Sequence, residues 1–151
     1  MNKISIIIPI YNEVNSIIKL LSHLKNKAFQ KDAIAIIIVD GCSKDDSQEK
    51  IVANSSLKLI QAEKGRAIQM NAGANAAKGN ILYFLHCDSF PPLHFDRIIN
   101  DAIQKGNLAG CFRMKFDYGH PVLMFSQWFT RFNHISCRGG DQSLFITNKF
   151  I

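Results

Sequence analysis

Four short apolar runs along the chain predict the strands of a buried sheet. Isoleucine and valine dominate residues 4–10 and 33–39, residues 81–85 form an unbroken apolar run, and residues 57–60 form a less apolar one. Runs of this length without polar alternation are typical of parallel strands that are buried on both faces. Pro9 is expected to end the pairing of the first strand, because proline has no N–H group to donate to a neighbour.

Apolar residues that recur every three or four positions predict helices between these strands. One helix is predicted to end near Lys27, a second opens at Gly65-Arg66, and a third covers 95–103 and ends at Gly106. The candidate caps of the first helix are Asn12, Asn15 and Ser16. The second helix is predicted to pack closely on the sheet through small residues, including Ala67, Ala74 and Ala77.

The order of these elements predicts the fold. Residues 111–118 alternate between apolar and polar side chains, as in a half-solvated antiparallel strand, and a last short strand is predicted at 143–147. Strands alternating with helices indicate an α/β fold with a doubly wound, mostly parallel sheet in a three-layer α/β/α arrangement. Right-handed crossovers then bring the loops of Pro9, Asp40 and Asp88 to one edge, where we predict a binding crevice.

The strand predicted at 81–85 turns polar within one step and leads to Asp88. In open α/β sheets, ligands bind at the carboxyl ends of the strands, so Asp88 is a candidate ligand-binding carboxylate. Because side chains alternate along a strand, His86 and Asp88 are expected to project to the same side. The alternative is that Asp88 only caps the helix that starts near Leu93.

Basic residues surround the start of the helix that opens at Gly65. Lys64 and Arg66, next to the backbone N–H groups of a helix N-terminus, are suited to bind phosphate. The sequence contains neither the P-loop pattern nor Gly-x-Gly-x-x-Gly. The alternative interpretation is an exposed basic residue at a helix start, with no ligand.

Composition narrows the class of protein. A chain of 151 residues is expected to form one domain, and its net charge of +6 favours an anionic partner. The basic residues are scattered, which disfavours a nucleic-acid interface. Four widely spaced cysteines are expected to stay reduced in the cytoplasm as small buried residues, and no apolar run is long enough to span a membrane. The aromatic segment 122–132 predicts a core or homodimer face, or alternatively a lid over a lipid-linked acceptor at a membrane surface.

Five stretches, in this order, resemble family 2 glycosyltransferases. They are Pro9–Glu13 (Pro-Ile-Tyr-Asn-Glu), Val39–Ser43 with Asp45, Lys64–Arg66 through Asn71–Gly73, Leu85–Asp88 (Leu-His-Cys-Asp) and Gly140–Gln142. The likeness is closest to the branch called radical-SAM/selenodomain-associated transferase 2, whose members carry a similar Leu-His-Ala-Asp stretch. The resemblance implies the Rossmann-like GT-A fold and one nucleotide-sugar-binding domain over residues 1–151.

The resemblance also implies roles for individual residues. Those that would line the nucleotide-sugar site are Pro9, Tyr11, Glu13, Asp40, Lys64, Arg66 and Asn71. Among them, Asp40 would bond the base and Arg66 would lie near the phosphates. Asp88 corresponds to the last acid of the family's Asp-x-Asp metal motif, and His86 stands where its first Asp often stands. A Mg²⁺ or Mn²⁺ ion held there would stabilise the charge that develops on the departing diphosphate.

The catalytic base is not assigned by the resemblance. Family members continue into a segment with a Glu-Asp pair that supplies the base, whereas no Glu follows Glu63 in this chain, which ends at Ile151. The chain is therefore expected to be truncated relative to the family, with Asp117 or Asp141 as candidate substitutes.

The function implied is a metal-dependent, inverting transfer of sugar from a nucleotide-diphosphate sugar. The acceptor would be a saccharide, a lipid-linked compound or a small molecule. Because the base is missing, the alternative is a non-catalytic nucleotide-sugar-binding module. A nucleotidyltransferase is a further alternative, although its glycine-rich amino-terminal loop is absent.

Overall fold

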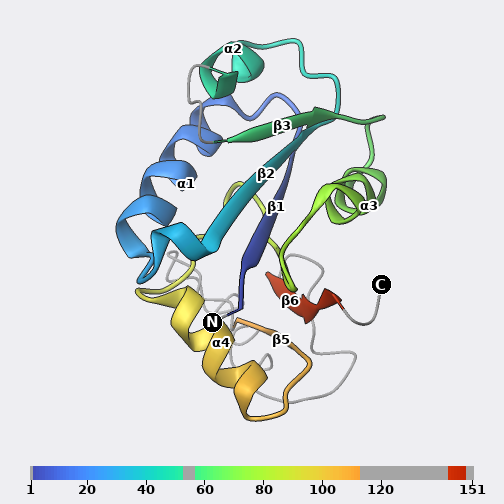
Figure 1. Ribbon diagram of the computed structural model, residues 1–151. Coiled ribbons are helices and arrows are strands. Elements are labelled where there is room, and N and C mark those ends of the chain that lie inside the picture. Colours follow the sequence, from blue (N-terminus) through green and yellow to red (C-terminus); the bar gives the residue numbers. More distant parts are fainter. Residues whose placement is uncertain (1, 53–56, 113–142, 149–151) are drawn as a thin grey trace, which may run out of the picture.

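A mixed β-sheet runs through the middle of the protein (Figure 1). The computed structural model describes residues 2–52, 57–112 and 143–148. Within these residues six strands pair in the order β3-β2-β1-β4-β6-β5. The strands are β1 (Ile4–Ile10), β2 (Ile34–Asp40), β3 (Lys58–Gln61), β4 (Ile81–Phe84), β5 (Ala109–Cys111) and β6 (Leu144–Thr147). The first four are parallel, and β6 is antiparallel to both β4 and β5, as expected for a mostly parallel sheet.

Strand β1 lies at the centre of the sheet, and its register corrects the prediction for Pro9. Pro9 does not end the pairing with β2, because it is opposite Val39 and the next residue, Ile10, still has a partner. The carbonyl of Ile10 accepts a bond from the β2 side, whereas that of Ile7 accepts one from the β4 side. The backbone groups of successive residues in β1 face β2 and β4 in turn, so an N–H group at position 9 would face β4. Pairing with β4 ends at Ile7, so the missing N–H of Pro9 removes no bond to β2.

Helices cover both faces of the sheet and form the predicted three-layer arrangement (Figure 1). Three helices pack on one face, namely α1 (Val14–Lys27), α2 (Ser47–Val52) and α4 (Phe95–Gln104). On the other face lies α3 (Arg66–Ala76), and a short 3-10 helix, η1 (Lys31–Ala33), precedes β2. No helix in the described parts of the chain is long and apolar enough to cross a bilayer.

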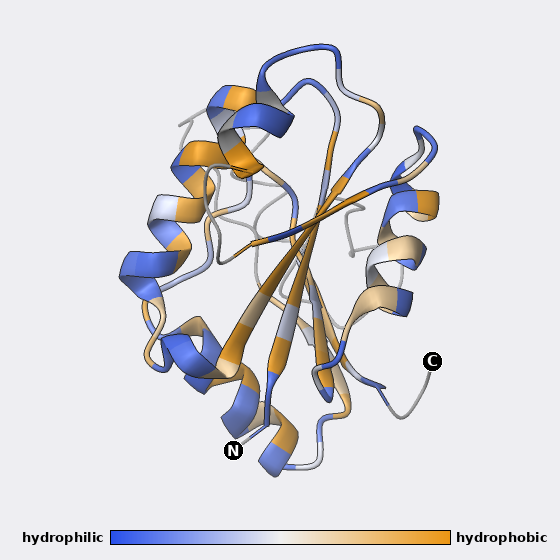
Figure 2. Ribbon diagram, turned by 45° about the horizontal axis from the view of Figure 1, so that its top comes forward, coloured by the Kyte–Doolittle hydropathy of each residue, from blue (hydrophilic) through white to orange (hydrophobic). Residues whose placement is uncertain are grey.

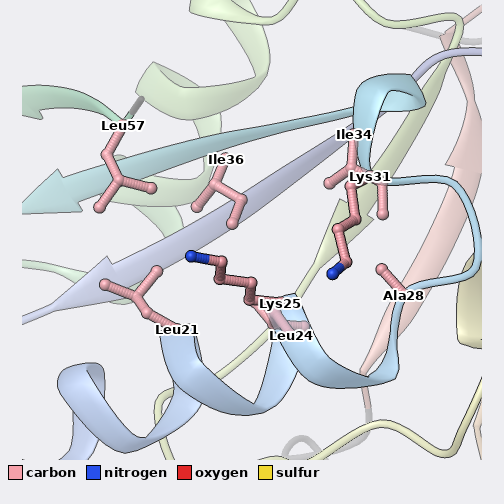
Figure 3. A pocket seen from close by; sticks show the side chains of 8 residues that line it. All are labelled: Leu21, Leu24, Lys25, Ala28, Lys31, Ile34, Ile36 and Leu57. Atoms are coloured by element: carbon pink, nitrogen blue, oxygen red, sulfur yellow. The ribbon is translucent and has the colours of Figure 1, made fainter. Parts of the chain in front are cut away.

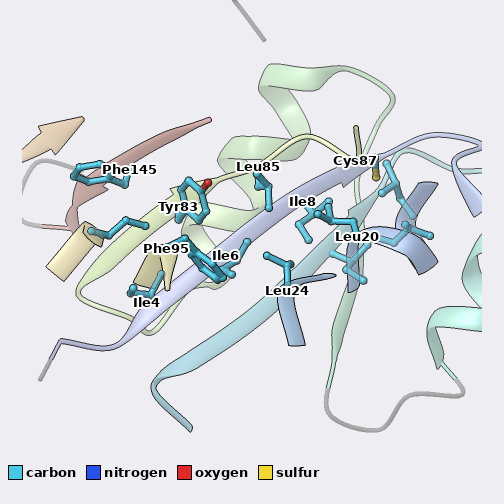
Figure 4. Close-up of a cluster of buried hydrophobic side chains, with 14 of the residues drawn as sticks. Ile4, Ile6, Ile8, Leu20, Leu24, Tyr83, Leu85, Cys87, Phe95 and Phe145 are labelled. Atoms are coloured by element: carbon cyan, nitrogen blue, oxygen red, sulfur yellow. The ribbon is translucent and has the colours of Figure 1, made fainter. Parts of the chain in front are cut away.

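The sheet separates two apolar cores. On the α1 side, alternate residues of β1 join side chains of α1, β4 and α4, including Leu20, Tyr83 and Phe95 (Figure 4). Under α3 the core is thinner, and a Cβ added to Gly73 would lie 2.4 Å from Cγ2 of Ile7. The backbone of α3 therefore approaches the sheet as closely as predicted. The contact residues differ in part: Ala67 is exposed, and the buried positions of α3 are Gln69 and Gly73.

The cap of α1 differs from the prediction, whereas α4 starts at Phe95 as predicted. Glu13 occupies the N-cap of α1 and makes no side-chain cap bond, so none of the three predicted caps takes that place. His94 occupies the N-cap of α4, in the left-handed region at φ 57° and also without a side-chain cap bond. Ile98, counted in the apolar stripe of α4, is 45% exposed.

Two strand predictions near the carboxyl end have different outcomes. The last short strand is confirmed as β6, one residue shorter than predicted. Of the predicted strand 111–118, the structure describes residues 111 and 112. Cys111 is the last residue of β5. The segment 122–132 and both candidate bases, Asp117 and Asp141, lie outside the described residues.

Candidate functional site

The parallel strands end together at one edge of the sheet, where hydrophilic loops follow them (Figure 2). Ile10, the last residue of β1, is opposite Asp40, the last residue of β2. The chain after β4 stays bonded to β1 as far as Leu85, whose N–H donates to the carbonyl of Ile7 at 3.0 Å. The loops after β1, β2 and β4 therefore share one edge, as predicted.

Side-chain bonds join the loop after β1 to the loop after β2. The N–H of Asn12 donates to Oγ of Ser43 at 2.9 Å, and Oδ1 of Asn12 accepts from the N–H of Lys44 at 2.8 Å. The N–H of Val14, at the start of α1, donates to Oδ2 of Asp45 at 3.2 Å. A carboxylate at a helix N-terminus is stabilising, so the loop after β2 supplies the acceptor that no local cap provides.

Asp40 is the most buried of the predicted site residues. Its side chain has no exposed surface and accepts bonds from the N–H of Ser43 at 3.1 Å and from Nε2 of Gln48 at 2.6 Å. The hydroxyl of Ser43 also donates to it. These donors satisfy the charge inside the protein and hold the loop that follows β2. The predicted bond from Asp40 to a nucleotide base stays a prediction, and it requires one of these donors to exchange.

Gln69, which was not among the sequence candidates, links three elements at this edge. Its Nε2 donates to the carbonyls of Ile10 at 2.7 Å and Val39 at 2.8 Å, at the ends of β1 and β2. Its Oε1 accepts a longer bond, 3.4 Å, from the N–H of Gly65 before α3. One sequence signal could have found it: Gln69 lies four residues before Gly73, on the face that packs on the sheet.

Basic and aromatic side chains meet beside the start of α3. Nζ of Lys64 lies 3.9 Å from the ring centroid of Tyr11, so the loops after β1 and β3 are in contact through a cation–π pair. Arg66 is the first residue of α3 and is exposed. The N-cap residue Gly65, at φ 157°, makes no side-chain cap bond. A helix N-terminus with two cations beside it is suited to bind a phosphate group.

Acidic side chains gather at the end of β4. Cys87 is buried, and this burial raises the pKa of its thiol to about 12, with further contributions from the carboxylates of Glu13 and Asp88. Both carboxylates therefore act on the same point, although they belong to different loops. The start of α3, in contrast, carries the cations Lys64 and Arg66.

The strand on which the shared side of His86 and Asp88 was predicted does not reach these residues, so that premise is wrong. Strand β4 ends at Phe84, and the chain turns at Cys87–Asp88, with the N–H of Ser89 donating to the carbonyl of His86 at 3.1 Å. The strand alternation on which the prediction rested has therefore stopped. His86 is 7% exposed, whereas Asp88 is exposed. The alternative role for Asp88 is also wrong, because α4 has no side-chain cap.

The described residues fit a divalent ion that receives most of its coordinating oxygens from a bound phosphate group and water. Among them, no three His, Cys, Asp or Glu side chains cluster as a metal site. Mg²⁺ needs only one or two carboxylates when phosphate oxygens and water complete its shell. Asp88 is exposed at the edge where the helix start suited to bind phosphate also lies, so it can supply one such carboxylate. Asn71 is exposed, more than one turn beyond the start of α3, and within the described residues no hydrogen bond connects it to the other candidates.

One cavity lies elsewhere, between α1 and the neighbouring strands (Figure 3). Its volume is about 280 Å³, and its lining is mostly apolar. The lining residues are Leu21, Leu24, Lys25, Ala28, Lys31, Ile34, Ile36 and Leu57, none of which is a predicted site residue. The chemistry at the sheet edge is therefore separate from this cavity.

Comparison with known protein families assigns the chain to one of them. Residues 5–150 match the family described as Glycosyl transferase family 2. The chain belongs to glycosyl transferase family 2.

Similar proteins include glycosyltransferases with different acceptors. The undecaprenyl-phosphate 4-deoxy-4-formamido-L-arabinose transferase of Aeromonas hydrophila is 31% identical over 73% of this chain and 36% of its own length. The poly(ribitol-phosphate) β-N-acetylglucosaminyltransferase TarS of Staphylococcus aureus is 31% identical over 60% of this chain and 17% of its own length. The chain spans between 17% and 37% of the length of the curated relatives it matches.

Two solved glycosyltransferase structures have a similar fold. S. aureus TarS in complex with UDP-GlcNAc aligns with a TM-score of 0.67 and 25% identity, over 79% of this chain and 37% of its own. Glucosyl-3-phosphoglycerate synthase of Mycobacterium tuberculosis, with Mn²⁺, UDP and phosphoglyceric acid, aligns with a TM-score of 0.69 and 14% identity, over 98% of this chain and 56% of its own. These likenesses confirm the predicted GT-A fold.

Proposed function

We propose that this domain binds a nucleotide-diphosphate sugar at the carboxyl edge of the sheet and transfers the sugar to an acceptor. The observation that carries the proposal is the division of charge along this edge. Lys64 and Arg66 lie at the start of α3, and Glu13 and Asp88 lie in the loops that follow β1 and β4 at the same edge. A diphosphate with a divalent ion needs both kinds of charge within one site.

The donor is assigned to the edge as follows. Pro9, Tyr11 and Glu13 line the nucleotide pocket, and Asp40 holds its wall through Ser43 and Gln48. Lys64, Arg66 and Asn71 face the diphosphate, with Lys64 held over the ring of Tyr11. Asp88 binds Mg²⁺ or Mn²⁺, with His86 as a supporting residue. These roles extend the family resemblance to the contacts of this chain.

The chemistry follows from the charge that develops on the diphosphate as the sugar leaves. A divalent ion at Asp88 would neutralise part of that charge. The cations at Lys64 and Arg66 stabilise the same oxygens from the helix side. Attack from the opposite side of the sugar inverts its configuration, and the acceptor proton goes to a base, for which Asp117 and Asp141 are the candidates in this chain.

The names of the relatives and the ligands in the solved structures indicate which donors and acceptors to test first. One neighbour holds UDP-GlcNAc and another UDP with Mn²⁺, which supports a uridine nucleotide as the first donor to test. One relative's name specifies a lipid phosphate and another's a poly(ribitol-phosphate). The proposed acceptors are therefore a saccharide or polymer, a lipid-linked compound, or a small molecule. The chain's widely spaced cysteines support a cytoplasmic location, and its Leu85–Asp88 stretch supports the radical-SAM/selenodomain-associated branch. We treat residues 1–151 as one domain.

A thermal-shift screen of the 151-residue chain tests the proposal. The ligands are UDP, GDP, ADP and their sugar conjugates, each with and without Mn²⁺. At a ligand concentration of 100 times Kd, binding stabilises the fold by about 2.7 kcal/mol, which corresponds to roughly 5–10 °C in Tm. Inorganic diphosphate with Mn²⁺ is the matched control for binding that does not use the base. The proposal is wrong if no nucleotide shifts Tm more than this control.

The second candidate is a module that binds donor without efficient transfer. General-base catalysis contributes typically 10²–10⁴-fold, so a domain without it would release sugar slowly and mainly to water. Mass spectrometry of the products from UDP-GlcNAc with and without added acceptors distinguishes the two. Slow hydrolysis that no acceptor accelerates supports the module, whereas fast acceptor-dependent transfer excludes it.

A further inference from the structure

We propose that Gln69 is the positioning residue of the donor site, setting the base-binding and phosphate-binding loops in one relative geometry. Gln69 is 4% exposed, so it acts through its neighbours and not by touching the donor. The amide nitrogen Nε2 donates to two carbonyls at the ends of neighbouring strands, those of Ile10 in β1 and Val39 in β2. The inference rests on the proposed function, because it concerns the same edge.

The residues that Gln69 holds are adjacent to the proposed donor ligands. Ile10 precedes Tyr11, and Val39 precedes Asp40. Each carbonyl that Gln69 bonds therefore belongs to the residue just before a proposed donor-binding residue. On its other side, Oε1 accepts from the N–H of Gly65, between Lys64 and Arg66.

The surroundings of Gln69 leave its amide little room to move. A Cβ added to Gly41 would lie 3.1 Å from Nε2 of Gln69 and 3.2 Å from Cδ, so the loop after β2 packs directly on the amide. Four residues further along α3, Gly73 packs against Ile7 and Val39. A shorter side chain at position 69 would leave two buried carbonyls without this donor, and an apolar one of equal length would do the same.

This geometry predicts a uniform loss of affinity when the amide is removed. A ligand-binding residue such as Arg66 affects only the part of the donor that it touches. Loss of positioning instead lowers the fraction of molecules in the binding geometry, and every ligand loses affinity by that fraction. If about one tenth of the Gln69→Met molecules have the binding geometry, the affinities for uridine and for UDP should both decrease about tenfold.

Two variants and one control test the inference. Gln69→Met keeps the length of the side chain and removes its donors. Gly41→Ala keeps Gln69 and crowds its amide, so it provides the same readout if the first variant does not fold. Asn100→Leu is the control, because Asn100 is a buried amide in α4 whose side chain, within the described residues, bonds only inside its own helix, to the carbonyl of Asp96 at 2.9 Å.

The affinities of uridine and UDP are measured by NMR titration and calorimetry at a temperature where each variant is folded. Equal fold-losses for both ligands in the two edge variants, with wild-type affinity in Asn100→Leu, support the inference. A loss for UDP alone, or reduced Tm with unchanged affinity, overturns it.

Amide hydrogen exchange separates this inference from the proposed function. If the wild-type chain binds neither uridine nor UDP, the proposed donor fails, but the mechanical role of Gln69 is still measurable without ligand. Gln69→Met should then increase exchange together in residues 10–14, 40–46 and 62–66. Increased exchange in α3 alone contradicts the inference.

Discussion

The contact between Asp40 and Gln48 gives the most direct test of how the loop after β2 is held. The perturbation is Asp40→Asn, which replaces one carboxylate oxygen by an N–H₂ group and removes the charge. Oδ2 of Asp40 accepts the bond from Nε2 of Gln48 at 2.6 Å, so the substituted amide would place two donors against each other. Ser43 still has an acceptor, because its N–H also lies 3.2 Å from Oδ1.

The magnitude follows from these contacts. One hydrogen bond to a fully buried charge is lost, which costs about 1.5–3 kcal/mol. For a domain of this size, such a loss lowers Tm by roughly 3–12 °C. Gln48 can recover part of this energy by rotating its amide. That rotation breaks the bond in which its Oε1 accepts from Nε2 of Gln61, at 3.3 Å in the wild-type protein. We therefore expect a loss near the middle of the range, about 2 kcal/mol.

The assay is urea unfolding followed by circular dichroism, with a double-mutant cycle. Gln48→Glu alone places a carboxylate against Asp40 and should destabilise the protein. In the double variant Asp40→Asn with Gln48→Glu, the new amide donates to the new carboxylate, so part of the loss should be recovered. Asp101→Asn, an exposed acid in α4, is the control for loss of charge alone. The reasoning fails if the Asp40 and Gln48 changes add within about 0.5 kcal/mol.

Four further predictions follow from other contacts. Arg66→Ala should weaken UDP by about tenfold or more and leave uridine unchanged, as measured by calorimetry; equal losses would contradict its phosphate role. Asp88→Asn should remove the Mn²⁺-dependent part of UDP affinity without lowering Tm, and an unchanged Mn²⁺ effect would refute it. The folded pKa of Cys87 is raised from 9.0 to about 12, so the stability that its protonated thiol contributes is complete below pH 9 and decreases between pH 9 and 12. Cys87→Ala should therefore reduce the fall of the urea midpoint between pH 9 and pH 10, and an unchanged slope would contradict this. Gly73→Ala should cost about 1–3 kcal/mol in urea unfolding, since its Cβ would lie 2.4 Å from Cγ2 of Ile7, and wild-type stability would show that α3 can move away from the sheet.

The sequence by itself determined the layout of the sheet and the edge at which the candidate site lies. The apolar runs that became β1, β2 and β4 lack polar alternation, because both faces of these strands are covered by helices. Burial on two faces restricts every position of a strand, so it is visible in a short window of sequence. Parallel pairing then required the ends of these strands, with Asp40 at the end of β2 and Asp88 after β4, to meet at one edge.

Only the tertiary structure decided which polar groups are used inside the protein. Asp45 bonds the start of α1 from 31 residues away, and Gln69 reaches Ile10 across 59 residues. Asp40 was predicted as a ligand residue, yet it is buried against Ser43 and Gln48. A hydrogen bond constrains one pair of atoms and leaves no periodic pattern along the chain. Its partners therefore become evident only when the fold has brought the loop ends together.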